Sequence, residues 1–328
     1  MKGDFERYLA AKATVDDRAL DRAVLARFRD DVRVRSDPRI LEAGAGTAAF
    51  CRRFLSWDDL PDCTYVAVDT DPALLATART RVLRAAREAG FRASLADPTT
   101  TDLGLPFGPA GDDPGEGNDA AGGDGPDTPT TVAAVRLSGP ARIDVRLVAG
   151  DALTVAAEAR WDALVAQAFV DLLSPADVER LVSGVVDGGA VYLPITFDGG
   201  TVFEPSHPAD DAVLDAYHAT MVGDDGDRLG ARAGRRLRTL LPEFGVDVVA
   251  SGRSDWRVEP TDDAGVQAGY TADEAYFLAV IVDTVADAVR GHVPDGEVDA
   301  WLAARREQRE AGVLRFGARN LDLYGCRR

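Results

Sequence analysis

The sequence predicts an α/β fold built on a doubly wound, mostly parallel β-sheet. Two observations lead to this prediction. Residues 39–50 join a short apolar strand to a helix through Gly44 and Gly46, and residues 64–69 form a second apolar strand that ends in Asp69, 23 residues after Gly46. A strand, a glycine turn, a helix and a second strand together form the unit from which parallel sheets are built.

The glycine turn is typical of a loop that binds a nucleotide cofactor. Glycine lets the backbone turn tightly and leaves main-chain N–H groups open to a ligand beside a helix N-terminus. Read as Gly-x-Gly-x-x-Ala, the loop fits a dinucleotide. Glu42 stands two residues before Gly44. It favours a different cofactor, because a carboxylate there does nothing for the pyrophosphate that a dinucleotide places at the helix N-terminus.

Read as Glu-x-Gly-x-Gly, residues 42–46 resemble motif I of the class I (Rossmann-like) S-adenosylmethionine-dependent methyltransferases. Residues 68–72, 143–152 and 161–169 resemble further motifs of that family, and the closing run 314–326 is similar to its antiparallel last strand. The resemblance is specific over most of residues 39–200 and only architectural elsewhere. It implies a three-layer α/β/α domain with a seven-stranded, mostly parallel, doubly wound sheet whose last strand is antiparallel.

The resemblance also implies which residues hold S-adenosylmethionine. Glu42 would face the methionine part, Asp69 the ribose hydroxyls, Thr70 the adenine, and Asp151 the adenine amino group. Ala48 stands where the fullest form of motif I has a glycine. The complete implied cofactor set is Glu42, Ala43, Gly44, Gly46, Asp69, Thr70, Asp151, Ala152 and Gln167.

The remaining segments predict the domain organisation. Residues 1–36 are expected to form an N-terminal helical cap, and residues 37–328 the methyltransferase domain. Apolar residues recur at helical spacing from Phe5 to Phe28. Tyr8, Lys12 and Arg18 are therefore candidate lid residues over the cofactor; the alternative is a plain amphipathic helix. Residues 97–131, rich in Gly, Asp, Pro and Thr, are expected to be a disordered insertion before a hairpin of residues 132–137 and 143–148.

Residues 198–227 are expected to form a substrate-cap insertion over the transferred methyl group. Methyl transfer needs an aligned nucleophile and, when that nucleophile carries a proton, a base within reach. His218 is the first candidate base because imidazole titrates near neutrality, and Glu204 and Asp255 are the next. Tyr217, Trp256 and Phe203 are candidates for an aromatic substrate wall. For each of these residues the alternative is ordinary packing in the core.

The expected function is methyl transfer to a small molecule whose acceptor atom is left open. The strand that ends near residue 169 is followed neither by the Asn/Asp-Pro-Pro-aromatic signature of amino-directed nucleic-acid methyltransferases nor by a Pro-Cys nucleophile. Asp171 follows that strand without a second acid and Asn in a metal-binding pattern, so no metal is expected. Two alternatives remain: an NAD(P)-dependent Rossmann oxidoreductase, and a non-catalytic S-adenosylmethionine-binding protein.

The composition indicates the environment. The net charge is −18, from 55 acidic and 37 basic residues, and lysine occurs only at Lys2 and Lys12. An acidic, lysine-poor surface stays hydrated where salt screens charge over roughly 3 Å, as at 1 M. We therefore expect a halophilic, archaeal, cytoplasmic protein; the alternative is ordinary acidity from a GC-rich genome. No run of about 18 apolar residues and no basic cluster with interleaved aromatics occurs, so neither a membrane nor nucleic acid is expected as a partner. The oligomeric state is not indicated.

Overall fold

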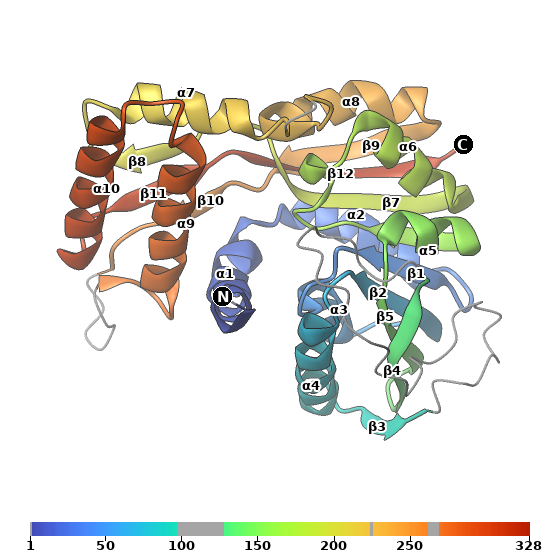
Figure 1. Cartoon of the computed structure of the whole chain (residues 1–328). Coiled ribbons are helices and arrows are strands. Elements are labelled where there is room, and N and C mark those ends of the chain that lie inside the picture. Colours follow the sequence, from blue (N-terminus) through green and yellow to red (C-terminus); the bar gives the residue numbers. More distant parts are fainter. Residues whose placement is uncertain (1, 97–127, 224–225, 262–268) are drawn as a thin grey trace, which may run out of the picture.

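A nine-stranded sheet forms the centre of the molecule, with the strand order β3-β4-β5-β2-β1-β6-β7-β12-β9. The computed structural model describes residues 2–96, 128–223, 226–261 and 269–328 (Figure 1). The strands of this sheet are β1 (Arg39–Ala43), β2 (Cys63–Asp69), β3 (Arg92–Leu95), β4 (Thr130–Ser138), β5 (Arg142–Ala149), β6 (Trp161–Val165), β7 (Val185–Phe197), β9 (Val246–Arg253) and β12 (Asn320–Arg327).

The seven strands that the sequence predicts correspond to seven neighbouring strands of this sheet, from β5 to β9 in the spatial order. β5, β2, β1, β6 and β7 are parallel, and the last strand, β12, runs antiparallel between β7 and β9. The sheet has two more strands than predicted, because β4 pairs antiparallel with β5, and β3 pairs with β4 at the edge of the sheet. The predicted hairpin is therefore confirmed, with Thr130 and Thr131 already in β4. The rest of the predicted insertion, 97–127, lies outside the described residues.

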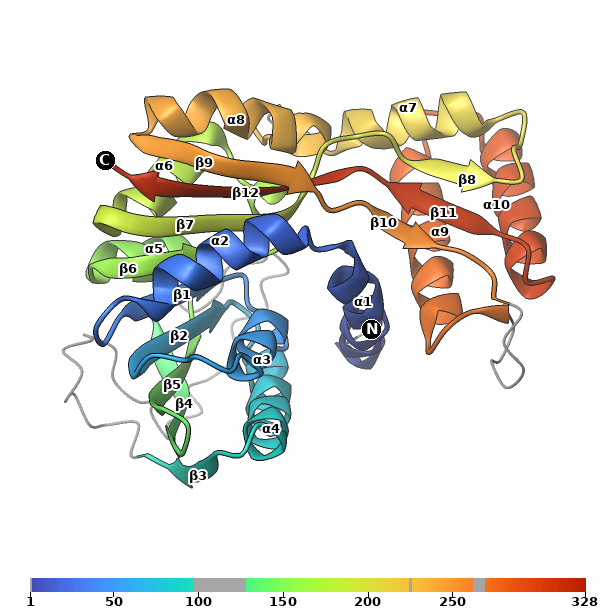
Figure 2. The same cartoon turned by 180° about the vertical axis from the view of Figure 1, so that it is seen from behind.

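Helices cover both faces of the main sheet and make three layers (Figures 1 and 2). Apolar side chains of α2, α3 and α4 pack on one face, and those of α5, α6 and α8 on the other. These helices are α2 (Arg22–Arg33), α3 (Ala49–Leu55), α4 (Pro72–Glu88), α5 (Ala152–Glu158), α6 (Pro175–Ser183) and α8 (Ala233–Glu243), with short 3-10 turns η1 (Val170–Leu172) and η2 (Gly230–Arg232).

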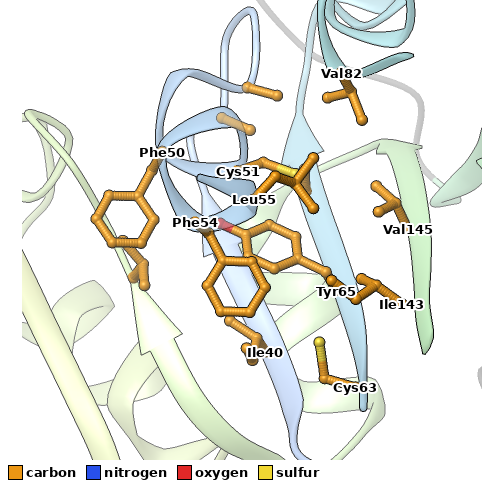
Figure 3. Packing of buried hydrophobic residues seen from close by; sticks show 14 of the residues in the cluster. Ile40, Phe50, Cys51, Phe54, Leu55, Cys63, Tyr65, Val82, Ile143 and Val145 are labelled. Carbon is orange, nitrogen blue, oxygen red and sulfur yellow. The ribbon is translucent and has the colours of Figure 1, made fainter. Parts of the chain in front are cut away.

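The core beneath α3 fixes the helix that follows the glycine turn. Figure 3 shows Cys51, Phe54 and Leu55 of α3 on the side of β1 and β2, whereas Phe50 points the other way, with its ring centroid 5.8 Å from that of Tyr192 on β7. The side chains of all four α3 residues are almost completely buried. Burial raises the pKa of the Cys51 thiol well above its ordinary value. This cysteine is therefore a small core residue whose burial disfavours the thiolate form.

A second lobe extends beyond the ends of β7, β9 and β12 of the main sheet. It contains a three-stranded sheet of β8 (Val202–Glu204), β10 (Trp256–Val258) and β11 (Arg315–Ala318), in the order β10-β11-β8. Helices α7 (Asp210–Thr220), α9 (Glu274–Val289) and α10 (Asp295–Glu310) pack on it, together with α1 (Lys2–Ala19). Figure 2 shows β8, β10 and β11 as continuations of β7, β9 and β12.

The predicted closing strand is divided between the two sheets. β11 and β12 are separated at Arg319, where Asp198 N donates to Arg319 O at 2.8 Å and Ser254 N donates to Asn320 O at 3.0 Å. These crossing segments join the two lobes with ordinary backbone hydrogen bonds. No helix in the described parts of the chain is both long and apolar enough to cross a membrane.

Candidate functional site

A cavity of about 650 Å³ lies at the carboxyl ends of the central parallel strands, between the main sheet, α1 and the second lobe. The strand order reverses between β1 and β6, which makes this the topological switch point where open α/β sheets bind ligands. The predicted cofactor residues that line it are Glu42, Gly44, Gly46, Asp69, Thr70 and Gln167.

The glycine turn takes backbone conformations that favour glycine. Gly44 and Gly46 have φ values of +66° and +53°. A Cβ on Gly44 would come within 2.4 Å of the Phe169 ring, so the turn packs directly against the segment that follows β6. Ala48 also adopts the left-handed region, with φ of 56°. Ala48 therefore holds a conformation that glycine would take more easily, at the cost of local strain.

Asp69 is tied to the glycine turn. Its Oδ2 accepts from Gly46 N at 2.7 Å, and its Oδ1 accepts from Asp71 N at 3.0 Å. Burial raises its pKa, and the backbone N–H groups of Asp71 and Gly46 oppose that effect. Each oxygen keeps lone-pair capacity, so the carboxylate can also accept from two neighbouring hydroxyls of a ligand.

Glu42 is a buried carboxyl group at the floor of the cavity. It is 3% exposed, and its Oε2 accepts from Tyr65 Oη at 2.9 Å and from Cys51 N at 3.2 Å. Burial raises its pKa to about 7, against the opposing effect of these hydrogen bonds. The Glu42 carboxyl group therefore titrates near neutrality. Its two hydrogen bonds hold it at the start of the glycine turn.

Three predicted cofactor residues lie elsewhere. Ala43 is buried in β1, and Ala152 is buried at the start of α5. The exposed Asp151 caps α5, because its Oδ1 accepts from Leu153 N and its Oδ2 from Thr154 N. None of the three is among the described cavity-lining residues. The aspartate of this Gly-Asp sequence is therefore a helix N-cap. Aspartate is one of the residues most often found in that role.

Helix α1 covers the cavity, and Asp16 holds it there. The Asp16 side chain accepts from Lys12 Nζ at 2.6 Å and from Gln167 Nε2 at 3.0 Å through Oδ2, and from Trp256 Nε1 at 2.9 Å through Oδ1. These donors come from α1, from the segment after β6 and from the second lobe. Asp16 is 3% exposed. It is a site residue that the sequence analysis missed, since only the fold brings its three partners together.

The candidate lid residues have different positions. Tyr8 and Lys12 line the cavity, and the Tyr8 ring stacks on Phe277 with 5.7 Å between centroids. Arg18 lies outside the described cavity lining and instead forms an ion pair with the buried Glu274 at the start of α9, with 2.5 Å between Nη1 and Oε1. Arg18 therefore attaches α1 to the second lobe rather than facing a ligand.

The aromatic-wall prediction is right in position for two residues and wrong for one. Tyr217 and Trp256 line the cavity. Phe203 does not, because it is 2% exposed within the core of the second lobe, where its ring packs against Trp301 and Phe316 at centroid distances of 5.4 and 5.2 Å. Alternation on the short strand β8 places Phe203 on the covered face.

The three predicted bases do not reach the cavity; none is among its described lining residues. His218 Nε2 lies 2.9 Å from Thr201 Oγ1, and burial lowers the histidine pKa. Glu204 is exposed on β8. Asp255 accepts from Asn320 N at 3.2 Å and pairs with Arg253. Each therefore has a structural partner or faces solvent, so the sequence-based assignment of a base was wrong in position.

Asp171 is a carboxylate of the cavity that the sequence analysis considered only as a metal ligand. It lies on η1, directly after β6, and it lines the cavity. Burial raises its pKa to about 6, and Lys12 opposes that effect. Its Oδ1 is buried and has no hydrogen-bond partner among the described residues. The sequence signal was present, since a carboxylate after the fourth parallel strand is placed at the switch point.

Comparison with known proteins gives distant structural likenesses only. No protein-family model and no curated protein matches the sequence. A SAM-dependent methyltransferase from Thiobacillus denitrificans, solved in complex with S-adenosyl-L-homocysteine, is 15% identical over 94% of this chain and 93% of its own, with a TM-score of 0.42. A SAM-dependent methyltransferase from Archaeoglobus fulgidus is 11% identical over 93% and 92%, with a TM-score of 0.38. Both scores are below 0.5, so the site is interpreted from its own geometry.

The charges around the cavity favour a cationic ligand. The described lining residues carry the five carboxyl groups of Asp16, Glu42, Asp69, Asp71 and Asp171, and one cation, Lys12. The cation is already paired with Asp16. In a partly enclosed site such an excess of carboxylates attracts positive charge and repels phosphate.

Proposed function

We propose that this protein is an S-adenosylmethionine-dependent methyltransferase that acts on a small molecule. The observation that carries the proposal is the joined pair of the glycine turn and Asp69, with 2.7 Å between Gly46 N and Asp69 Oδ2, above the buried Glu42. The cofactor would supply an electrophilic methyl group on a positively charged sulfur. The chain supplies a cavity that is rich in carboxylates and large enough for a small-molecule ligand, within the usual range of about 300–1,000 Å³.

The residues present fit this cofactor in three ways. Asp69 has free lone pairs for a pair of ribose hydroxyls. Glu42 places a carboxyl group where the α-ammonium of a methionine chain would donate. Gly44 and Gly46 let the turn pass close beneath the covering segments, since a Cβ on Gly44 would meet the Phe169 ring at 2.4 Å and a Cβ on Gly46 would lie 3.3 Å from Leu9 Cδ1. Gln167 is held by Asp16 and by Arg53, whose Nη1 donates to its Oε1 at 3.1 Å, so the far wall is also fixed.

The charge balance disfavours the oxidoreductase alternative. A dinucleotide carries two phosphate anions at the helix N-terminus. Here Glu42, Asp69 and Asp71 line the cavity at that turn, and the described lining offers no unpaired cation to offset them. A non-catalytic S-adenosylmethionine-binding protein would share the same site, so turnover distinguishes it from an enzyme.

The setting that we propose is the salt-rich cytoplasm of a halophilic archaeon. The net charge of −18 and the scarcity of lysine support it. Among the ion pairs found in the described residues, every cation except Lys12 is an arginine. We also propose the division into a cap at 1–36, a catalytic domain at 37–328 and a substrate cap at 198–227; α7 and Tyr217 of that last segment lie over the cavity.

Calorimetric titration in molar salt tests the cofactor. Separate titrations would use S-adenosylmethionine, S-adenosylhomocysteine and NAD, with wild type and Asp187→Asn as a control at an exposed carboxylate on β7. We expect binding of the first two ligands by both proteins and no binding of NAD. Binding of NAD alone would support the oxidoreductase, and binding of none would refute the proposed cofactor.

A further inference from the structure

We propose that the methyl acceptor is an amine, bound in its ammonium form by the Asp171 carboxylate and the aromatic side chains around it, and that Asp171 takes up the proton that the amine loses. This inference rests on the proposed methyltransferase function and adds the class of acceptor and the base. It starts from a buried carboxylate oxygen that lacks a donor.

Asp171 has an unmet need for a hydrogen-bond donor. Its Oδ1 is buried and has no partner among the described residues. A buried anionic oxygen without a partner is costly, so such groups are normally hydrogen-bonded. Lys12 is near enough to attract the carboxylate electrostatically, but its Nζ is bound to Asp16 at 2.6 Å. The residue as a whole is partly exposed and lines the cavity, so its carboxylate is open to a cationic ligand there.

Aromatic side chains line the cavity together with Asp171. They are Tyr8 of α1, Tyr217 of α7 and Trp256 of β10, and Tyr8 and Tyr217 lie near enough to Asp171 for its charge to raise their pKa. Trp256 is fixed by its Nε1–H donation to Asp16, and its ring already attracts a cation, with Lys12 Nζ 4.9 Å from the ring centroid. A ligand ammonium would gain from both the carboxylate and the ring faces. A phenolate or carboxylate acceptor would be repelled, and a neutral alcohol would gain only a hydrogen bond.

The two phenols add to the polarity of the cavity without adding charge. Burial, and then the Asp171 carboxylate, raise the pKa of Tyr217 to about 12. The pKa of Tyr8 is raised further, by burial first and then by Asp16, Tyr217 and Asp171. Both side chains therefore stay neutral, and the groups that set the charge here are Asp171, Asp16 and Lys12. Since the last two form a pair, Asp171 is left as the uncompensated anion.

An amine that binds as an ammonium has to lose one proton before its nitrogen can attack the methyl group, and Asp171 is placed to take up that proton. A bound ammonium donates to the Asp171 carboxylate and then passes its proton to that group, which frees the nitrogen lone pair. The nitrogen forms a bond to the methyl carbon as the carbon–sulfur bond breaks, and the bonding electrons remain on sulfur, which becomes a neutral thioether. The methylated product is again an ammonium, and Asp171 releases its proton to solvent. The carboxylate remains mostly ionised at neutral pH, since its pKa is about 6.

The test is a pair of isosteric probes that differ in charge. Protein saturated with S-adenosylhomocysteine is titrated at neutral pH with 2-phenylethylamine, which is protonated, and with 2-phenylethanol, in the same salt. Wild type, Asp171→Asn and the control Asp215→Asn are compared; Asp215 is an exposed carboxylate on α7. We expect wild type and the control to bind the amine about tenfold tighter than the alcohol, and Asp171→Asn to lose that preference.

Three outcomes would overturn the inference. They are equal binding of the two probes by wild type, a preference for the amine that persists in Asp171→Asn, and the absence of binding by either probe. Binding of S-adenosylhomocysteine itself is measured first in every protein. If it binds and the charge preference is missing, the acceptor class is wrong and the proposed function stands; if it does not bind to wild type, the proposed function fails.

Turnover provides a second readout for the base. Where wild type methylates an amine, Asp171→Asn should lower kcat about 100-fold or more, and Asp171→Glu, which restores a carboxylate, should recover part of the loss. An Asp171→Asn variant that retains wild-type kcat would show that another group takes the proton. Circular dichroism and S-adenosylhomocysteine affinity show whether each variant is folded.

Discussion

Replacing Asp16 by Asn should separate α1 from the cavity wall. The substitution keeps the shape of the side chain and removes the charge that accepts from Lys12, Gln167 and Trp256. The side chains of Lys12 and Asp16 are only 11% and 4% exposed, so the ammonium of Lys12 would be left buried without its anion. Removing one partner of a buried ion pair typically costs about 3–5 kcal/mol, and we expect a loss of about 3 kcal/mol because asparagine can keep one of the hydrogen bonds.

Urea-induced unfolding in molar salt measures this loss, and two further variants interpret it. Asp17→Asn is the matched control, since the neighbouring Asp17 side chain is 64% exposed and forms an ion pair with Arg53; it should cost less than about 1 kcal/mol. Adding Lys12→Met to Asp16→Asn removes the stranded charge and should recover about 2 kcal/mol. Equal effects of Asp16→Asn and Asp17→Asn, or no recovery in the double variant, would refute the assigned role of Asp16.

Three other predictions concern the floor of the cavity. Asp69→Ala should weaken binding of S-adenosylhomocysteine by about 1–3 kcal/mol in calorimetry, and unchanged affinity would rule out its contact with the ribose. Gly44→Ala should destabilise the protein more than Gly188→Ala, because both residues have positive φ but only the Gly44 Cβ would meet Phe169, at 2.4 Å, whereas at Gly188 nothing lies within 4 Å; equal melting temperatures would contradict the close packing. The pKa of Glu42 is raised from 4.5 to about 7, so its folded form retains a proton that the unfolded form loses. Stability relative to Glu42→Gln should therefore fall by about 3 kcal/mol as the pH rises from below 4.5 to above 7, and a difference independent of pH would show that Glu42 has no raised pKa.

The part of the site whose residues come directly after the parallel strands could be predicted from the sequence. The turn at Gly44 and Gly46 and the carboxylate at Asp69 each follow a strand directly, and parallel strands place their carboxyl ends at one edge. The order of the elements therefore determines where these residues meet. Asp151 shows the limit of that reasoning, since an Asp after a strand is also a common helix N-cap, and here it has that role.

The acceptor half could not be predicted in the same way, because it is made by contacts between distant segments. Asp16 and Trp256 are 240 residues apart and share a hydrogen bond. Three crossings join the main sheet to the small sheet, from β7 to β8, from β9 to β10 and from β11 to β12, and Phe203 of β8 lies in the core of the second lobe. A motif cannot show such crossings, so Trp256 could not be preferred to Phe203 as a wall residue from the sequence.

The choice of base illustrates a difference between intrinsic chemistry and environment. His218 is the better base in water, yet it lies behind Thr201 with a partner of its own. Asp171 is a weak base in water, but burial raises its pKa towards neutrality, and the residue lines the cavity. A buried carboxylate and a cationic acceptor stabilise each other, so the environment that makes Asp171 a usable base also selects an amine as the group to be deprotonated. Base and acceptor are therefore one inference: the two probes of different charge test the acceptor class, and turnover of the Asp171 variants tests the base.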